Sequence, residues 1–182
     1  LEQWLAMLPP TWLTESTGLK LCQGVLWARQ ENPRTTSLLQ SVIESCRPDA
    51  DLERYALAVG ELSYLYHMQN NYRLGHQWLE KLQIEALPQR LQAHLLHRHG
   101  LALIGVDHFE RANSVLARAL ALRQQLNSVE DELVANSLTR LQAITYSYRG
   151  LLQPAIKLLL EASQRIESVP NHNFYLAWTL NN

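Results

Sequence analysis

The stretch 100–119 reads GLALIGVDHFERANSVLARA, and it decides the fold because small and bulky residues recur in it at fixed intervals. The positions 0, +12, +16 and +19 are occupied by Gly100, Ala112, Leu116 and Ala119. Bulky residues stand at +3 and +9, as Leu103 and Phe109. Small residues on two facing helices let their backbones approach closely, and bulky residues fill the space between layers. The stretch therefore predicts a helical hairpin.

The same spacing occurs twice more in the chain. The four positions are Ser63, Gly75, Leu79 and Leu82 in one stretch, and Ala143, Ala155, Leu159 and Ala162 in the other. The bulky positions are Tyr66 and Tyr72, then Tyr146 and Leu152. A unit that recurs in this way buries its apolar face by stacking on its neighbours. The prediction is an all-α protein, a right-handed α-solenoid of helical hairpins without strands.

The repeat divides the chain into hairpins of one solenoid domain, 1–182. We expect repeats at about 15–46, 50–84, 88–126 and 128–168, and the start of a further repeat at 171–182. The first repeat fits less well. Gly24 and Thr36 keep the interval of 12, but Gln40 stands where an apolar residue is expected, so this repeat is predicted to be a divergent cap.

Prolines and short polar residues predict where the helices begin and end. Pro9 and Pro10 are expected to stop a short helix over 1–8, because proline lacks the amide donor and clashes with the preceding turn. Side-chain acceptors for free amides at helix starts are predicted at Asp49, Asp51, Asp107, and Ser128 with Asp131.

Composition excludes several classes of protein. Sixteen Lys and Arg against 17 Asp and Glu, with no densely basic stretch, argue against direct nucleic-acid contact. No apolar run approaches the roughly 20 residues of a membrane span, and no signal peptide is recognisable at the N-terminus. Two cysteines, Cys22 and Cys46, are too few for a disulfide framework. The expectation is a cytoplasmic protein without membrane contact.

Catalytic and metal sites find little support in the residues. His94 and His97 share a helix face, but His99 points elsewhere, and two imidazoles without an acidic or cysteine partner make a poor zinc site. No Gly-x-Ser-x-Gly turn occurs. We therefore expect no enzymatic activity, no metal and no cofactor.

The repeated positions resemble the tetratricopeptide repeat (TPR) family over about 50–168. The interval is 37 residues from Tyr72 to Phe109 and 43 from Phe109 to Leu152, longer than the 34 of the plain pattern. This period, with the opening Trp4-Leu5-x-x-Leu8-Pro9, resembles the repeat region of MalT-type, LuxR-family transcriptional regulators.

The second resemblance implies a ligand- or protein-binding, signal-sensing module of such a bacterial regulator. The alternative is a general TPR adaptor that binds a peptide or partner protein in its concave groove. No residue of the family's ATPase or DNA-reading modules can be carried over, because the chain holds neither a phosphate-binding loop of the form G-x-x-x-x-G-K-[ST] nor a recognisable DNA-reading helix.

The TPR resemblance also implies which residues line the groove. Carried onto this chain, the concave positions are Arg29, Tyr64, His67, Met68, His94, His97, Leu101, Arg140, Ile144 and Tyr148. Aromatic and Met side chains can contact apolar groups, and Arg or His can hold a carboxylate or phosphate. The expected partner is a protein, a peptide or a small-molecule effector. The other interpretation, that these side chains are only solvated or packed inside the superhelix, stays open.

The two ends suggest a segment of a larger protein. The chain opens on Leu1, and Phe174, Leu176 and Trp178 begin an apolar segment without a partner helix. An apolar helix face without its next repeat predicts self-association through the exposed repeat ends.

Overall fold

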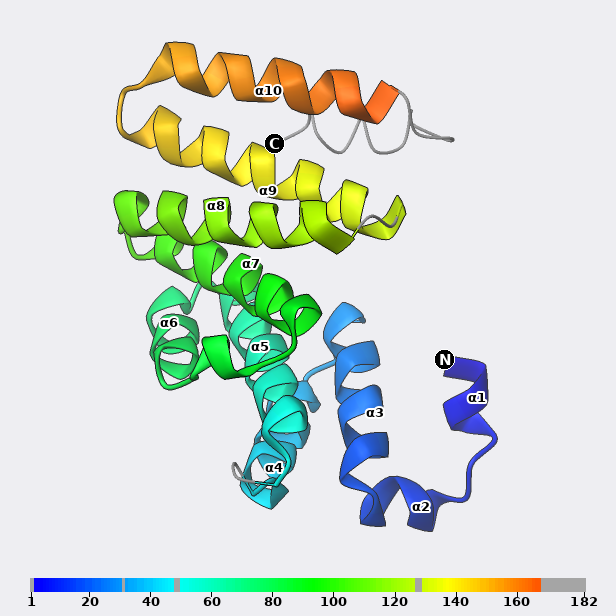
Figure 1. The fold of residues 1–182 in the computed structure, drawn as a ribbon. Helices are drawn as coiled ribbons and strands as arrows, with labels where there is room; N and C mark the ends of the chain where they lie inside the picture. Colours follow the sequence, from blue (N-terminus) through cyan, green and yellow to red (C-terminus); the bar gives the residue numbers. More distant parts are fainter. Residues whose placement is uncertain (1, 31, 48–49, 127–128, 168–182) are drawn as a thin grey trace. The chain divides into compact units, whose positions relative to one another are not determined.

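Every regular element among the residues that the structure describes, 2–30, 32–47, 50–126 and 129–167, is a helix (Figure 1). The structure is a computed structural model, and it divides the chain into two compact units, Leu1–Leu87 and Pro88–Asn182. The expectation of one continuous domain stays a prediction.

The first unit contains six α-helices and one short 3₁₀ helix among its described residues. They are α1 (Glu2–Ala6), α2 (Pro10–Glu15), α3 (Thr17–Arg29), α4 (Thr35–Ser45), α5 (Leu52–Met68), α6 (Tyr72–Glu80) and η1 (Ile84–Ala86). Helix α3 packs on α4, α4 on α5, and α5 on α6. The expected stop at Pro9 and Pro10 is half right: α1 ends before them, but Pro10 opens α2, since proline is tolerated at the first helical position.

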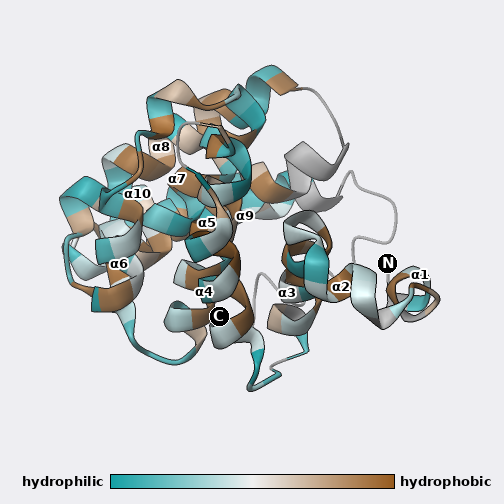
Figure 2. Ribbon diagram, turned by 90° about the horizontal axis from the view of Figure 1, so that it is seen from below, coloured by the Kyte–Doolittle hydropathy of each residue, from teal (hydrophilic) through white to brown (hydrophobic). Residues whose placement is uncertain are grey.

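The second unit consists of two long hairpins that stack in chain order (Figure 1). Its helices are α7 (Gln89–Gly105), α8 (Phe109–Leu126), α9 (Val129–Tyr148) and α10 (Leu152–Glu167). Hydrophobic and hydrophilic residues are mixed along the helices of both units, as in amphipathic helices that bury one face (Figure 2). None of the helices in the described ranges has the length and apolar content to cross a bilayer.

Three hairpin turns repeat one backbone conformation. Asn70, Asp107 and Gly150 have φ angles of 58°, 62° and 74°, in the left-handed region. The amide after each donates to a carbonyl five residues back: Asn71 to Tyr66 at 2.7 Å, His108 to Leu103 at 2.9 Å, and Leu151 to Tyr146 at 2.9 Å. This closure satisfies carbonyls left free at a helix end. The acceptors are the bulky +3 residues of the repeat.

The turn geometry corrects one predicted cap. Asp107 does not precede α8 directly, because α8 begins two residues later, at Phe109. Its left-handed conformation ends α7 instead, a role that Asp and Asn fill more readily than other residues with a side chain.

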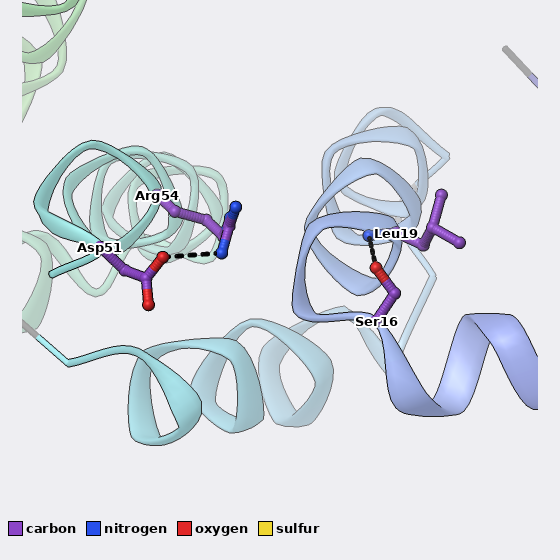
Figure 3. Close-up of polar contacts among 4 residues, drawn as sticks. All are labelled: Ser16, Leu19, Asp51 and Arg54. Atoms are coloured by element: carbon purple, nitrogen blue, oxygen red, sulfur yellow. Dashed lines mark hydrogen bonds and ion pairs between the residues drawn. The ribbon is translucent and has the colours of Figure 1, made fainter.

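Figure 3 shows the start of α3 and the start of α5. Ser16 caps α3, its Oγ accepting from the amide of Leu19 at 3.3 Å. Asp51 precedes α5 as predicted but makes no side-chain cap bond. Its carboxylate pairs with Arg54 at 2.8 Å instead, so the prediction of a cap bond was wrong. Asp49 and Ser128, and the side chain of Asp131, lie outside what the structure describes.

Helices approach closely at the small residues of the repeat. Ser63 of α5 is 1% exposed, and its Oγ donates to the carbonyl of Gly75 on α6 at 3.1 Å. A Cβ atom added at Gly75 would lie 2.9 Å from that Oγ and 3.0 Å from the Ser63 carbonyl oxygen. One added at Gly100 would overlap the side chain of Leu116. The absence of a Cβ atom therefore lets α5 touch α6 at Gly75 and α7 touch α8 at Gly100.

In the first hairpin, the buried residues of α4 lie one position before those that the repeat predicts. Thr35, Leu39 and Val42 of α4 are fully buried, whereas Thr36 and Gln40 are half-buried. Leu39 lies against Gly24 of α3, and the Gln40 amide reaches the Tyr66 hydroxyl at 3.4 Å. Gly24 and Thr36 keep the interval of 12 in the sequence, but Thr35 is the fully buried residue in place of Thr36. The helix α4 begins at Thr35, later in its repeat than α6, α8 and α10, and its buried face shifts with that start.

We predict that Gly75→Ala lowers the free energy of unfolding by roughly 1–3 kcal/mol, because the added methyl group meets the backbone of Ser63. Gly18→Ala is the matched control. An added Cβ there meets nothing closer than 3.8 Å, so the gain in helix propensity should leave stability equal or slightly higher. Urea unfolding of both variants measures the difference. Equal stabilities would contradict the close contact.

A second prediction concerns the buried alanines. Ala112 and Ala155 are 0% and 2% exposed, so Leu at either position should force the paired helices apart and destabilise by about 1–3 kcal/mol. Ala117→Leu, on the exposed side of α8, should change stability by less than about 0.5 kcal/mol. Thermal and urea denaturation distinguish these cases. A loss in the control as large as in the buried variants would show that the helix contacts are misplaced.

Candidate functional site

The residues predicted to line the groove fall in both compact units. Arg29 is the last residue of α3, and its side chain lies outside the described part. Tyr64, His67 and Met68 belong to α5 in the first unit. The second unit holds the remaining six: His94, His97 and Leu101 on α7, and Arg140, Ile144 and Tyr148 on α9.

In the first unit, the predicted residues form an aromatic cluster at the end of α5. The rings of Tyr64 and His67 stack with centroids 6.4 Å apart and planes 12° from parallel. Tyr72, at the start of α6, lies 5.2 Å from the His67 ring and is tilted by 58°. Met68 is 51% exposed beside them. One face of α5 thus carries half-buried stacked rings beside an exposed thioether, a combination that suits apolar contact.

In the second unit, positively charged side chains on three helices lie near enough to His97 to lower its pKa. Arg98 follows it on α7, Arg123 lies near the end of α8, and Arg140 lies on α9. Arg123 is only 6% exposed, and the other two are half-buried. Helix α8 packs on both α7 and α9, and α7 also touches α9, which explains why these side chains converge.

This environment keeps His97 neutral. Removal of the half-buried ring from water is the main reason that its pKa falls to about 3. The positive charges of Arg98, His94, Arg123 and Arg140 lower it further. Burial also lowers the pKa of Arg140, although an arginine stays protonated in proteins. At neutral pH the cluster therefore contains charged guanidinium groups around an uncharged imidazole.

Sequence reasoning missed Arg98 and Arg123. Arg98 directly follows a predicted groove residue. Arg123 continues the buried series of Ala112, Leu116 and Ala119 by one helical turn, and an arginine at an apolar position was the available signal. Asn136, one turn before Arg140, is also buried at 5% exposure, and its Oδ1 has no hydrogen-bond partner among the described residues.

The remaining predicted residues of this unit lie further along α7 and α9. Leu101 and Ile144 are half-buried. Tyr148 is 68% exposed and stacks on Phe109 of α8, with ring centroids 4.8 Å apart and planes 8° from parallel. Tyr146 faces the same helix, where its hydroxyl accepts from the Asn113 amide at 3.4 Å. Tyr148 is therefore a contact between helices as well as an exposed ring.

The chemistry of the second unit favours an anion over a cation. Guanidinium groups bind carboxylates and phosphates through paired hydrogen bonds, and a neutral imidazole can donate one more. A metal ion at His94 and His97 would instead meet the positive charges of Arg98, Arg123 and Arg140. Together with the neighbouring apolar residues, these groups suit an acidic segment of a polypeptide.

Solved structures of MamA, a TPR-like helical repeat protein, are similar to this chain in fold. The structure titled "MamA MSR-1 C2" has a TM-score of 0.61 and 23% identity, over 85% of this chain and 79% of that one. "MamA AMB-1 C2221" has a TM-score of 0.58 and 23% identity, over 82% and 78%. No protein-family model and no curated protein matches the chain. The all-α, TPR-like solenoid fold is thereby confirmed.

The neutral His97 predicts a pH dependence of stability. Its folded pKa of about 3 lies below the ordinary value of 6.5, so between these values the unfolded chain binds more protons. Stability should be complete above pH 6.5 and fall as the pH drops toward 3. His97→Gln should remove this part of the loss, on the order of 2 kcal/mol between pH 6.5 and 4.5.

Urea unfolding of the parent and of His97→Gln at pH 6.5 and at pH 4.5 measures this loss of stability. The control is His108→Gln, at an exposed histidine of the same unit. An unchanged pH dependence in His97→Gln would show that the ring is protonated in the folded state.

Proposed function

We propose that this chain is a non-catalytic, TPR-like module that binds a peptide or a segment of a partner protein. The observation that carries the proposal is the convergence of Arg98, Arg123 and Arg140 around the neutral His97 in the second unit. Guanidinium groups bind carboxylates strongly, and several positive charges in one region attract an anionic group. A ligand that carries a carboxylate would meet these charges at a place where apolar side chains also offer contact.

The proposed ligand is an acidic segment with apolar neighbours. Pro88–Asn182 carries nine Lys and Arg against seven Asp and Glu, whereas Leu1–Leu87 carries seven against ten. The positive excess of the second unit favours a negatively charged partner there. In the first unit, Tyr64, His67 and Met68 form a separate surface that would bind apolar or aromatic residues of a peptide. The proposal includes no nucleic-acid or membrane contact and no cofactor.

A narrower hypothesis makes the module the sensor of a MalT-type, LuxR-family regulator. It rests on the opening Trp4-Leu5-x-x-Leu8-Pro9 and on the long repeat period. The similarity to MamA concerns the fold and does not bear on it. Cytoplasmic localisation belongs to the same proposal, and the free thiols of Cys22 and Cys46 suit a reducing compartment.

Peptide selection tests the function. Peptides enriched from a random displayed library by the whole chain should contain Asp or Glu beside apolar residues. Arg140→Ala should weaken their binding at least about ten-fold, the size expected for one charge-assisted pair. Arg140→Lys should weaken it less, and Arg111→Ala, at an exposed site on α8, should not change it.

Tyr64→Ala should weaken the binding of those peptides that bind the first unit, while circular dichroism and thermal unfolding show that the fold persists. Selection of no peptides, or of peptides that bind Arg140→Ala and Tyr64→Ala as tightly as the parent, would refute the proposed binding surface.

A further inference from the structure

The buried side of helix α9 is half polar. This helix lies between α8 and α10 in the second unit (Figure 1). Among its described side chains, the buried polar ones are Asn136, Thr139, Gln142 and Thr145, and the buried apolar ones are Ala135, Leu138, Leu141 and Ala143. On α7, by contrast, His99 is the one buried residue that is neither apolar nor glycine. Burial of polar groups stabilises a fold less than burial of apolar groups, so α9 gains less from its packing than α7 does.

Three of these polar side chains add little to the contacts between helices. The hydroxyl groups of Thr139 and Thr145 donate to carbonyls of their own helix, at 3.0 Å and 2.7 Å. Asn136 is 5% exposed, and its Oδ1 accepts no hydrogen bond from the described part of the chain. A buried acceptor that lacks a donor lowers stability. The polar residues of α9 therefore do not replace the apolar packing that they displace.

Helix α10 contributes little apolar packing of its own. Ala155 and Ala162 are the buried residues among its described side chains, and alanine has little area to bury. The larger residues Leu152, Ile156 and Leu160 are 61%, 50% and 58% exposed. Most of the apolar surface of α10 thus adds nothing to its attachment to α9.

The pair α7 and α8 is held much more firmly. Leu95, Leu96, Leu103 and Leu116 are each at most 2% exposed, and Leu116 lies directly over Gly100. Full burial of leucine side chains is among the largest favourable contributions to folding. The second unit therefore consists of one strongly packed hairpin and one weakly packed hairpin.

The contacts that join the two hairpins near their turns are mostly exposed. Tyr148, which stacks on Phe109, is 68% exposed. Arg149 pairs with Glu110 at 3.1 Å, and the Glu110 side chain is 83% exposed, so water screens this ion pair. The part of a protein that opens first is the part with few buried apolar contacts and solvent-exposed links.

We propose that α9 and α10 open together as one local unit while α7 and α8 stay folded, and that a ligand bound at Arg140 closes this unit. The second part rests on the proposed function. Arg140 lies on α9, whereas His97 and Arg98 lie on α7, so a ligand that contacts both helices binds only when α9 is docked.

The opening regulates the proposed binding surface. A ligand that binds the closed state better than the open state shifts the population toward the closed state. The fraction of chains that are open lowers the apparent affinity in proportion. A substitution that tightens the packing of α9 therefore strengthens binding without touching the ligand.

Hydrogen exchange of the whole chain, followed by mass spectrometry at neutral pH, tests the opening without any ligand. Segments of α9 and α10 should lose protection together and exchange at least about ten-fold faster than segments of α7 and α8. Equal protection of all four helices would overturn the proposal.

Two substitutions that remove buried polar groups test its cause. Asn136→Leu and Thr139→Val should each slow the exchange of both α9 and α10 by about five-fold or more, because an apolar side chain of similar shape replaces a poorly compensated polar one. Gln124→Leu, at an exposed position of α8, should leave these rates unchanged. Slowing that is confined to α9, or that is absent in both variants, would contradict a joint opening.

A peptide of alternating Glu and Leu residues serves as the probe for closure. Its binding should slow the exchange of α9 and α10 in the parent and not in Arg140→Ala. Binding without slower exchange in these helices would overturn the ligand-dependent closure. If the peptide does not bind and the exchange without ligand is as expected, the local opening is supported, and the ligand-dependent part fails together with the proposed function.

Discussion

Close approach of paired helices at small side chains is the constraint on which the rest of this structure depends. Ser63 touches Gly75 through a hydrogen bond to its carbonyl, and Leu116 occupies the space that a side chain at Gly100 would fill. Helices that approach so closely have little tolerance for added volume. The contact also fixes how far one helix can slide along the other, so it sets the register of the hairpin and thereby which side chains face outward.

The hairpin turns work with this constraint. In three repeats a left-handed residue follows the first helix, and the next amide closes on the carbonyl of the bulky +3 residue. Asn, Asp and Gly serve equally at these positions, because each reaches positive φ at lower cost than other residues. The second helix therefore always begins two residues later, as Tyr72, Phe109 and Leu152. In the second repeat this brings Tyr72 against His67 and completes the aromatic cluster of α5.

Burial gives the two faces of the second unit different chemistry. Between α7, α8 and α9, arginines take positions that would otherwise be apolar, and their charge and partial removal from water keep His97 uncharged. On the outer side of α10 the opposite substitution occurs, since leucine and isoleucine stand where the equivalent face of α8 is covered by α9. The first departure favours an anionic ligand, and the second leaves an apolar helix face exposed.

The sequence by itself determined the helical hairpins, because small residues at fixed intervals have one simple explanation in helix packing. Gly75 contacts Ser63 as predicted, and Ala112 and Ala155 are buried. It failed where local chemistry had more than one solution: Asp51 pairs with Arg54 instead of capping α5, Asp107 ends a helix instead of starting one, and α4 buries Thr35 in place of Thr36. Groove positions such as His97 and Arg140 came from the family resemblance. Only the tertiary structure brought Arg98 and Arg123 to them, because residues distant along the chain share a desolvated environment only once α7, α8 and α9 are packed.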